Sequence, residues 1–268
     1  MAYRYLILLF VLFSCKKVVY YKDSPLTGKS LAIAHRGGRT GLLRENTIYG
    51  STEALKKTDG VEIDIQISKD GTIWLSHNVE VENCETTINC FPETRDAEIK
   101  TIQNCNKDEL FYNRLEDLIA YMSTKYPDKY LIVDLKGWIP CSINSAGIEG
   151  MMRTEAEEVA RLGNKYHFSS HILLESDLVS VLNWGKKTAP EMKTFLRVFG
   201  DLERGMLICL KEKVHGISFK LHADEQLTDD YIALLHKKGL QISVWNLNNT
   251  QELEYWQQKG VDYIQFDL

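Results

Sequence analysis

Eight strand-like runs alternate with helix-like segments from residue 31 onward, and no other feature of the sequence constrains the fold as strongly. Strands that alternate with helices form parallel sheets covered by helices, and eight such repeats predict a closed (β/α)8 TIM barrel of the α/β class. The expected strands occupy residues 31–35, 61–67, 130–135, 171–175, 194–198, 215–219, 240–245 and 262–267.

Helical segments are expected in the intervals between these runs. Asn46 belongs to a residue type that favours the N-cap position, so we expect it to cap the first helix. Gly239 and Gly260 follow lysines at the ends of the last two helices, where glycine commonly stops a helix. The expected helices span residues 47–57, 115–126, 148–162, 176–187, 201–212, 228–238 and 250–259.

Residues 79–113 interrupt this alternation. A stretch of this length predicts an inserted loop or small subdomain after the second strand, lying over the active face of the barrel. Its cysteines predict a disulfide if the chain is exported. Cys84–Cys90 would close the smallest loop, but Cys90–Cys105 and Cys84–Cys105 stay open and Cys141 could compete, because connectivity does not follow from sequence.

The strand expected at 61–67 places Glu62 and Asp64 on one face. An ordinary half-exposed edge strand would show the same alternation, but strands of a parallel sheet covered by helices are normally apolar on both faces. Two carboxylates in an enclosed space repel each other and lose hydration unless a cation or basic groups compensate. The pair therefore predicts a metal site.

Several other polar residues are expected at the same end of the barrel, where TIM-barrel chemistry occurs. His35 ends the first strand, Asp134 and Lys136 end the third, and Trp245 ends the seventh. His77 follows a short extension behind the second strand. The topology thus predicts that these side chains meet at one mouth.

Asp134 completes an all-oxygen set with Glu62 and Asp64. Three carboxylates suit a hard divalent cation, Ca²⁺ or Mg²⁺. The alternative for Asp134 alone is a salt bridge to Lys136, which alternation places on the same face.

Five short motifs follow one another in a fixed order near the N-terminal end of the expected barrel. They read HRG at 35–37, RENT at 44–47, EID at 62–64, KDG at 69–71 and HN at 77–78. No single motif is specific, but the ordered set resembles the glycerophosphodiester phosphodiesterase family. The resemblance is strong to residue 78, and moderate over 130–136 and 240–267.

The resemblance implies an enzyme that hydrolyses glycerophosphodiesters to sn-glycerol 3-phosphate and an alcohol with the help of a divalent cation. Of His35 and His77, one would act as base and the other as acid. Arg36 would bind nonbridging phosphate oxygens beside the cation, and Lys136 would serve the same phosphate. A small-molecule diester is therefore the expected partner.

The resemblance also implies roles for two further residues. Glu45 would orient Arg36 or contact the metal and glycerol. Trp245 would wall the pocket beside the glycerol, although a packing residue at the barrel rim explains it nearly as well.

The sequence departs from the family pattern at several positions, among them Phe266 in place of a threonine near the C-terminus. Arg44 replaces a proline. Asn78 replaces an aspartate after the second histidine, which removes one charge near His77. Asp134 replaces a glutamate and is one methylene shorter.

The N-terminus predicts export. Residues 1–14 hold Arg4 and a short apolar run that resembles a signal segment, and LFSC at 12–15 resembles a lipobox. We therefore expect lipidation of Cys15, membrane anchoring, and a periplasmic or surface-facing envelope lipoprotein. The expected division is a signal peptide at 1–14, a tether at 15–30 and a phosphodiesterase barrel at 31–268.

The overall charge restricts the class of partner. A formal net charge of −5 argues against nonspecific nucleic-acid binding. The favoured function is a metal-dependent phosphodiesterase in lipid metabolism. The alternatives are a phospholipase D-like lyase on lysolipids, which uses the same barrel and histidine pair, and a catalytically inactive lipid-anchored binding protein.

Overall fold

Eight parallel strands close into a barrel in the computed structural model, which describes residues 30–38, 44–82, 87–102, 112–136, 145–221 and 227–268. The barrel closes because β1 pairs with both β2 and β11. The strands are β1 (Leu31–Ala34), β2 (Gly60–Ile67), β6 (Tyr130–Asp134), β7 (Ile172–Ser176), β8 (Lys193–Val198), β9 (Gly216–Lys220), β10 (Gln241–Leu247) and β11 (Tyr263–Phe266). All eight match the expected runs, so the predicted TIM barrel is confirmed.

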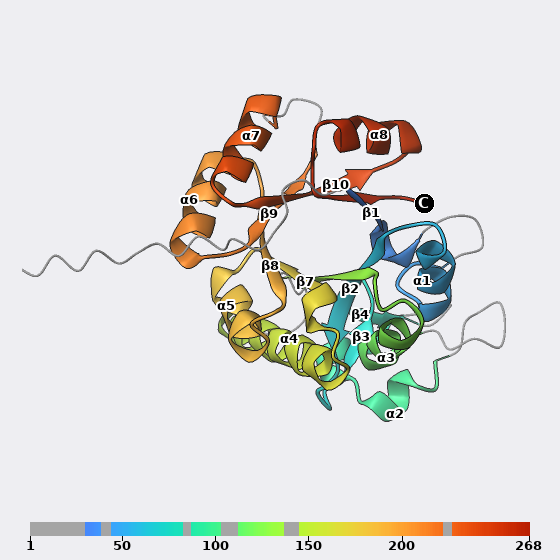
Figure 1. Ribbon diagram of the computed structural model, residues 1–268. Coiled ribbons are helices and arrows are strands. Elements are labelled where there is room, and N and C mark those ends of the chain that lie inside the picture. Colours follow the sequence, from blue (N-terminus) through green and yellow to red (C-terminus); the bar gives the residue numbers. More distant parts are fainter. Residues whose placement is uncertain (1–29, 39–43, 83–86, 103–111, 137–144, 222–226) are drawn as a thin grey trace, which may run out of the picture.

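Helices follow the strands and lie around the outside of the ring (Figure 1). Their inner faces and the outer faces of the strands form one large apolar core. They are α1 (Ile48–Leu55), α3 (Leu115–Lys125), α4 (Ser145–Lys165), α5 (Val179–Thr188), α6 (Leu202–Glu212), α7 (Asp229–Lys237) and α8 (Thr250–Gln258). Each overlaps one of the predicted helices.

The first helix corrects one prediction. The Thr47 hydroxyl, not the Asn46 side chain, accepts the hydrogen bond from the backbone amide of Gly50 and caps α1. Asn46 has a positive φ of 54° and turns its amide toward Asp64 instead. Both residue types favour N-caps, so the sequence did not distinguish them, and the contact with Asp64 decided which one caps the helix.

The barrel interior has an apolar layer and, two residues further along the same strands, a polar layer. The apolar layer comprises Ile33, Ile132, Leu173, Phe195 and Tyr263. The residues two positions later are His35, Asp134, Glu175, Arg197 and Gln265, and all five line one cavity. Because side chains alternate along a strand, the same inward face supplies both layers. The apolar layer closes the barrel beneath the polar one.

The insertion after the second barrel strand forms a small unit with its own core. It begins beyond β3 (Ile73–Leu75), which pairs antiparallel with β2, and contains β4 (Glu80–Glu82), β5 (Thr87–Cys90) and α2 (Asp96–Ile99). The core consists of Trp74, Val81, Phe91, Ile99, Ile102 and Tyr112.

Hydrogen bonds hold this unit against the barrel. Asp96 accepts them from the hydroxyls of Ser68 and Thr72 and from the indole of Trp74. Cys90 is disulfide-bonded, and the other expected partners, at 84, 105 and 141, lie outside the described residues.

The predicted signal segment, tether and Cys15 also lie outside the described residues. Within the described ranges, the helices are too short or too polar to cross a membrane.

Candidate active site

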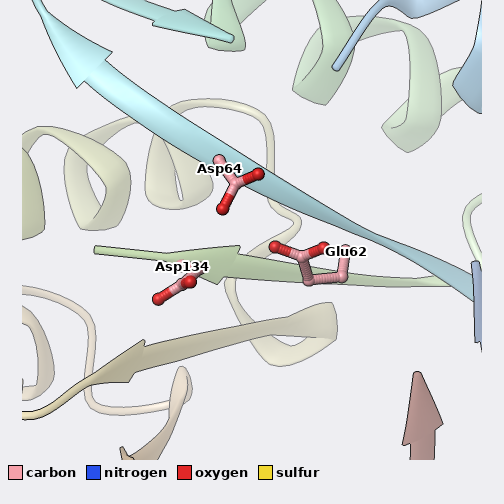
Figure 2. A group of neighbouring side chains, drawn as sticks. All are labelled: Glu62, Asp64 and Asp134. Atoms are coloured by element: carbon pink, nitrogen blue, oxygen red, sulfur yellow. The ribbon is translucent and has the colours of Figure 1, made fainter. Parts of the chain in front are cut away.

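Three buried carboxylates meet at the C-terminal end of the barrel. Glu62 and Asp64 lie on β2, and Asp134 lies at the end of β6 directly beside Asp64 in the strand register. One oxygen from each comes within 4.8 Å of the others, and Figure 2 shows the three side chains converging. Relative exposure is 7% or less for all three. The predicted acidic group is therefore assembled.

Backbone and amide groups fix the orientation of the first two acids. The backbone N–H of Arg36 donates to Glu62 Oε2 at 2.8 Å. Asn46 donates from Nδ2 to Asp64 Oδ2 at 3.0 Å and accepts from the Asp64 backbone N–H at the same distance. The RENT motif thus has a function that sequence reasoning missed, since Asn46 holds one of the acids in place.

The turn after β1 brings Arg36 to these acids. Arg36 and Gly37 both have positive φ, 53° and 70°. A Cβ on Gly37 would lie 2.5 Å from Ser51 Oγ, so both the backbone conformation and the space require glycine. The Arg36 side chain donates to Glu45 Oε1 at 3.0 Å, and its Nε lies 3.5 Å from Asp64. Glu45 therefore contacts Arg36, one of its two expected partners.

Two cations contact the acids, Lys136 from just beyond the end of β6 and the buried Arg197 from β8. Lys136 Nζ lies 2.7 Å from Asp64 and 2.9 Å from Asp134, so the expected Lys136–Asp134 pair exists and extends to a second acid. Arg197 donates to the other oxygen of Asp134. Burial alone would lower the pKa of Lys136, but Asp134 and Asp64 outweigh burial and raise it. Lys136 is therefore a permanent cation in the site.

The surroundings of Glu62 oppose its ionisation, and Lys136 compensates only in part. Burial raises the pKa of Glu62 well above its ordinary value, and the carboxylates of Asp64 and Asp134 raise it further. Burial opposes ionisation of Asp64 too, but Lys136, His77 and Arg36 together lower its pKa. The three carboxyl groups form an all-oxygen set with the donor chemistry that suits a hard divalent cation, and such a cation would favour the ionised form of Glu62. The residues present thus fit a metal ion.

The two predicted catalytic histidines face the same cavity. His35 Nδ1 lies 2.8 Å from Asp267 Oδ1, and its Nε2 lies 3.9 Å from Glu62. A carboxylate at this distance favours the tautomer with hydrogen on Nδ1, which leaves Nε2 to exchange protons. His77 Nδ1 lies 3.0 Å from Asn78 Oδ1, so an amide oxygen orients the second ring.

Two adjoining cavities share His77. The larger, about 340 Å³, extends across the barrel mouth from His35 to Phe199, Lys220 and Trp245. The smaller, about 230 Å³, lies on the side of the insertion and includes Glu45, Glu82 and Tyr112. One ligand with a group in each cavity would therefore pass beside the His77 ring.

Sequence reasoning missed four charged residues that line the larger cavity: Glu175, Asp177, Arg197 and Lys220. Glu175, Arg197 and Lys220 lie at the last or next-to-last position of a barrel strand. A charged residue directly after an apolar run could have identified them from the sequence. Gln265 holds Glu175 through hydrogen bonds of 3.1 and 3.2 Å. Burial and the neighbouring Asp134 raise the pKa of Glu175 to about 7.

Sequence comparison finds a protein family whose model matches most of this chain. The model of the Glycerophosphoryl diester phosphodiesterase family matches residues 35–268. The glycerophosphodiester phosphodiesterase of Caldanaerobacter subterraneus is 24% identical over 240 residues, which cover 88% of this chain and 93% of the relative. YhdW of Bacillus subtilis strain 168, named for the same activity, is 26% identical over 244 residues, with the same two shares.

Solved structures share the fold. A glycerophosphodiester phosphodiesterase from Parabacteroides distasonis superposes with a TM-score of 0.72 at 17% identity, covering 90% of this chain and 93% of that one. An Oleispira antarctica phosphodiesterase, solved with the product sn-glycerol-3-phosphate, gives a TM-score of 0.69 at 19% identity over 88% and 92% of the two chains.

Proposed function

This chain belongs to the glycerophosphoryl diester phosphodiesterase family, a family of phosphoric diester hydrolases, and we propose that it cleaves glycerophosphodiesters to sn-glycerol 3-phosphate and an alcohol in a metal-dependent reaction of lipid metabolism. One observation carries the proposal. Two histidines, Lys136 and the carboxylates of Glu62 and Asp134 line one cavity at the C-terminal end of the barrel, and Asp64 lies within 4.8 Å of those two acids.

Glu62, Asp64 and Asp134 would hold one divalent cation, Ca²⁺ or Mg²⁺. When bound, the ion would supply positive charge to nonbridging phosphate oxygens and stabilise the negative charge that develops in the transition state. Asp134 is already bonded to Lys136 and Arg197, so it would have to share its oxygens among these cations and the ion.

Arg36 and Lys136 would bind the phosphate. Glu45 holds the Arg36 guanidinium from one side, while Lys136 is fixed between two acids. Fixed donors stabilise developing charge without having to reorganise, which is the main source of electrostatic catalysis. Trp245 would contact one alcohol group of the diester in the larger cavity.

His35 and His77 would move the protons. In the first step a neighbouring glycerol hydroxyl forms a bond to phosphorus and gives its proton to one histidine. The bond from phosphorus to the head-group oxygen breaks, and the other histidine protonates that oxygen. Water then opens the cyclic phosphate with the two roles reversed, which yields sn-glycerol 3-phosphate and restores both histidines.

An assay of the purified chain on several glycerophosphodiesters, with and without a chelator, tests the proposal. We expect release of sn-glycerol 3-phosphate that stops on chelation and returns with Mg²⁺ or Ca²⁺. Full activity without metal would refute the metal role, and absence of turnover on every diester would refute the activity and favour a binding protein. Release of cyclic phosphate as the final product would favour the lyase.

We further propose that the protein is an exported envelope lipoprotein anchored through Cys15. The support is the apolar run and lipobox-like LFSC in the sequence. Cys15→Ser should move the protein out of the membrane fraction, and intact-mass measurement should show loss of the acyl chains. An unmodified mature N-terminus elsewhere would refute the anchor.

The insertion at 79–113 would act as a cap that sets substrate choice. Its residues Glu82 and Tyr112 line the cavity beside His77. Trimming this loop should alter specificity while the barrel still folds. Unchanged specificity would reject the cap.

A further inference from the structure

Aromatic side chains line both cavities. Among the described residues lining the cavities, the aromatic side chains are Phe199, Trp245 and Tyr112. Aromatic rings in a phosphodiesterase pocket would ordinarily suggest recognition of a quaternary ammonium head group, because ring faces attract cations.

Each of these rings already has a cationic side chain of the protein beside it. Arg197 Cζ lies 5.9 Å from the Phe199 ring centre, and Lys220 Nζ lies 5.6 Å from the Trp245 ring centre. In the smaller cavity Arg44 Cζ lies 5.6 Å from the Tyr112 ring centre. All three distances fall within the range of about 6 Å at which a ring attracts a cation. A cationic head group entering either cavity would have to compete with one of these side chains for the ring.

The cations beside these rings differ in how far carboxylates compensate them. Arg197 is paired with Asp134 and lies 3.8 Å from Asp177, and Glu45 and Glu82 lie near Arg44. Lys220, by contrast, forms no ion pair with any carboxylate of the described chain. Its charge is therefore available to a ligand.

Unsatisfied polar atoms indicate what the ligand must offer. The Trp245 indole Nε1 is buried and has no hydrogen-bond acceptor, and the neighbouring Asn246 Oδ1 is buried and has no donor. Buried polar groups without partners are costly, so a ligand that supplies partners gains affinity. An oxygen-rich group supplies acceptors for the indole and Lys220 and a hydroxyl for Asn246, whereas a trimethylammonium group offers neither donors nor acceptors.

We propose that the enzyme selects glycerophosphodiesters whose head group is an uncharged or anionic polyol and discriminates against quaternary ammonium head groups. This inference rests on the proposed function. In this proposal the head group, and not the glycerol expected beside Trp245 from the family resemblance, occupies the part of the larger cavity lined by Lys220, Trp245 and Asn246.

The test compares kcat/KM of the full chain for glycerophosphoinositol, glycerophosphoglycerol and glycerophosphocholine. We expect the first two to exceed the third by at least about tenfold, because like charges brought together without water disfavour binding. Lys220→Gln should reduce the ratio of kcat/KM for the polyol substrates to kcat/KM for glycerophosphocholine severalfold, chiefly because kcat/KM for glycerophosphocholine rises. Lys220→Arg should preserve this ratio.

Lys211→Gln is the matched control, because this lysine side chain is 81% exposed on α6 and should leave the ratio unchanged. Equal or faster turnover of the choline substrate would overturn the inference. An equal loss on all three substrates in Lys220→Gln would also overturn it, because the lysine would then serve the shared glycerol phosphate. No turnover of any diester would refute the proposed function itself, whereas turnover without preference refutes only the head-group choice.

Discussion

The two sides of the barrel mouth differ in how their charges are satisfied. On the side of β1, β2 and β6, Asp64 and Asp134 are held by Lys136 at 2.7 and 2.9 Å, and Asp64 is also held by Asn46. On the side of β9 and β10, Lys220 has no ion-pair partner among the described residues, and the Trp245 indole has no acceptor. The first side is preorganised for a reaction common to all substrates, and the second retains unpaired groups that a variable head group can satisfy.

We call the side formed by β1, β2 and β6 the reactive side. Its strongest test is the removal of one acid. Glu62→Gln should lower kcat/KM by at least about 10³-fold, because it replaces a carboxylate of the proposed metal site with a neutral amide. The variant should also lose the thermal stabilisation that Mg²⁺ or Ca²⁺ gives the native chain, measured by calorimetry.

Glu155→Gln is the control for this substitution. Glu155 is equally buried, at 2% exposure, but lies on α4 outside the cavities. Its removal should leave turnover and metal response intact. If both variants lost activity alike, the acid trio would have no special role.

The histidines test whether the reactive side works as one unit. His35→Ala and His77→Ala should each cost about 10²–10⁴-fold in kcat, and the double variant should cost little more than either single one. Steady-state kinetics on one diester measures all three. Near-native turnover by His77→Ala, or fully multiplicative losses, would contradict the paired mechanism.

Asp267 tests positioning within the same side. Asp267→Asn should lower kcat by about 10–10³-fold with little change in KM, because the amide no longer favours the required tautomer of His35. The pH profile of kcat should shift as well, which a purely structural loss would not produce.

A second histidine–carboxylate pair gives the control. His236 Nε2 lies 2.9 Å from Asp262, which precedes β11 at the opposite end of the barrel. Asp262→Asn should lower stability and leave the pH profile of kcat unchanged. Equal kinetic effects of the two substitutions would remove the distinction between the two pairs.

The smallest expected effect concerns stability rather than catalysis. Burial raises the pKa of Glu155 from 4.5 to about 8, against a hydrogen bond from the Ile67 backbone that lowers it. Between these pH values the folded chain retains a proton that the unfolded chain has lost, so the free energy of unfolding falls as pH rises from 4.5 to 8.

Glu155→Gln should remove this dependence. Relative to the native chain, the variant should gain about 1–4 kcal/mol of stability between pH 5 and pH 9 in urea unfolding. Parallel pH profiles for the two proteins would show that Glu155 does not stay protonated in the fold. Unlike the acids at the mouth, this buried acid has no cation beside it in the part of the chain that the structure describes.

Local sequence determined the barrel and the reactive side. The period-2 pattern of each strand and the strand–helix alternation are local properties, so all eight barrel strands were located from residue type alone. Glu62 and Asp64 share a face because they are two residues apart. His35, Asp134 and Lys136 reach the same mouth because parallel strands end on one side.

Tertiary structure decided which groups are paired. The hydrogen bond between Asn46 and Asp64 joins residues 18 positions apart, and Asp267 meets His35 across 232 positions. Arg197 reaches Asp134 from two strands away, across β7, while Lys220 has no carboxylate partner among the described residues. Sequence patterns report which face a side chain takes, but which partner it finds depends on the closure of the barrel, since closure alone brings distant strand ends together.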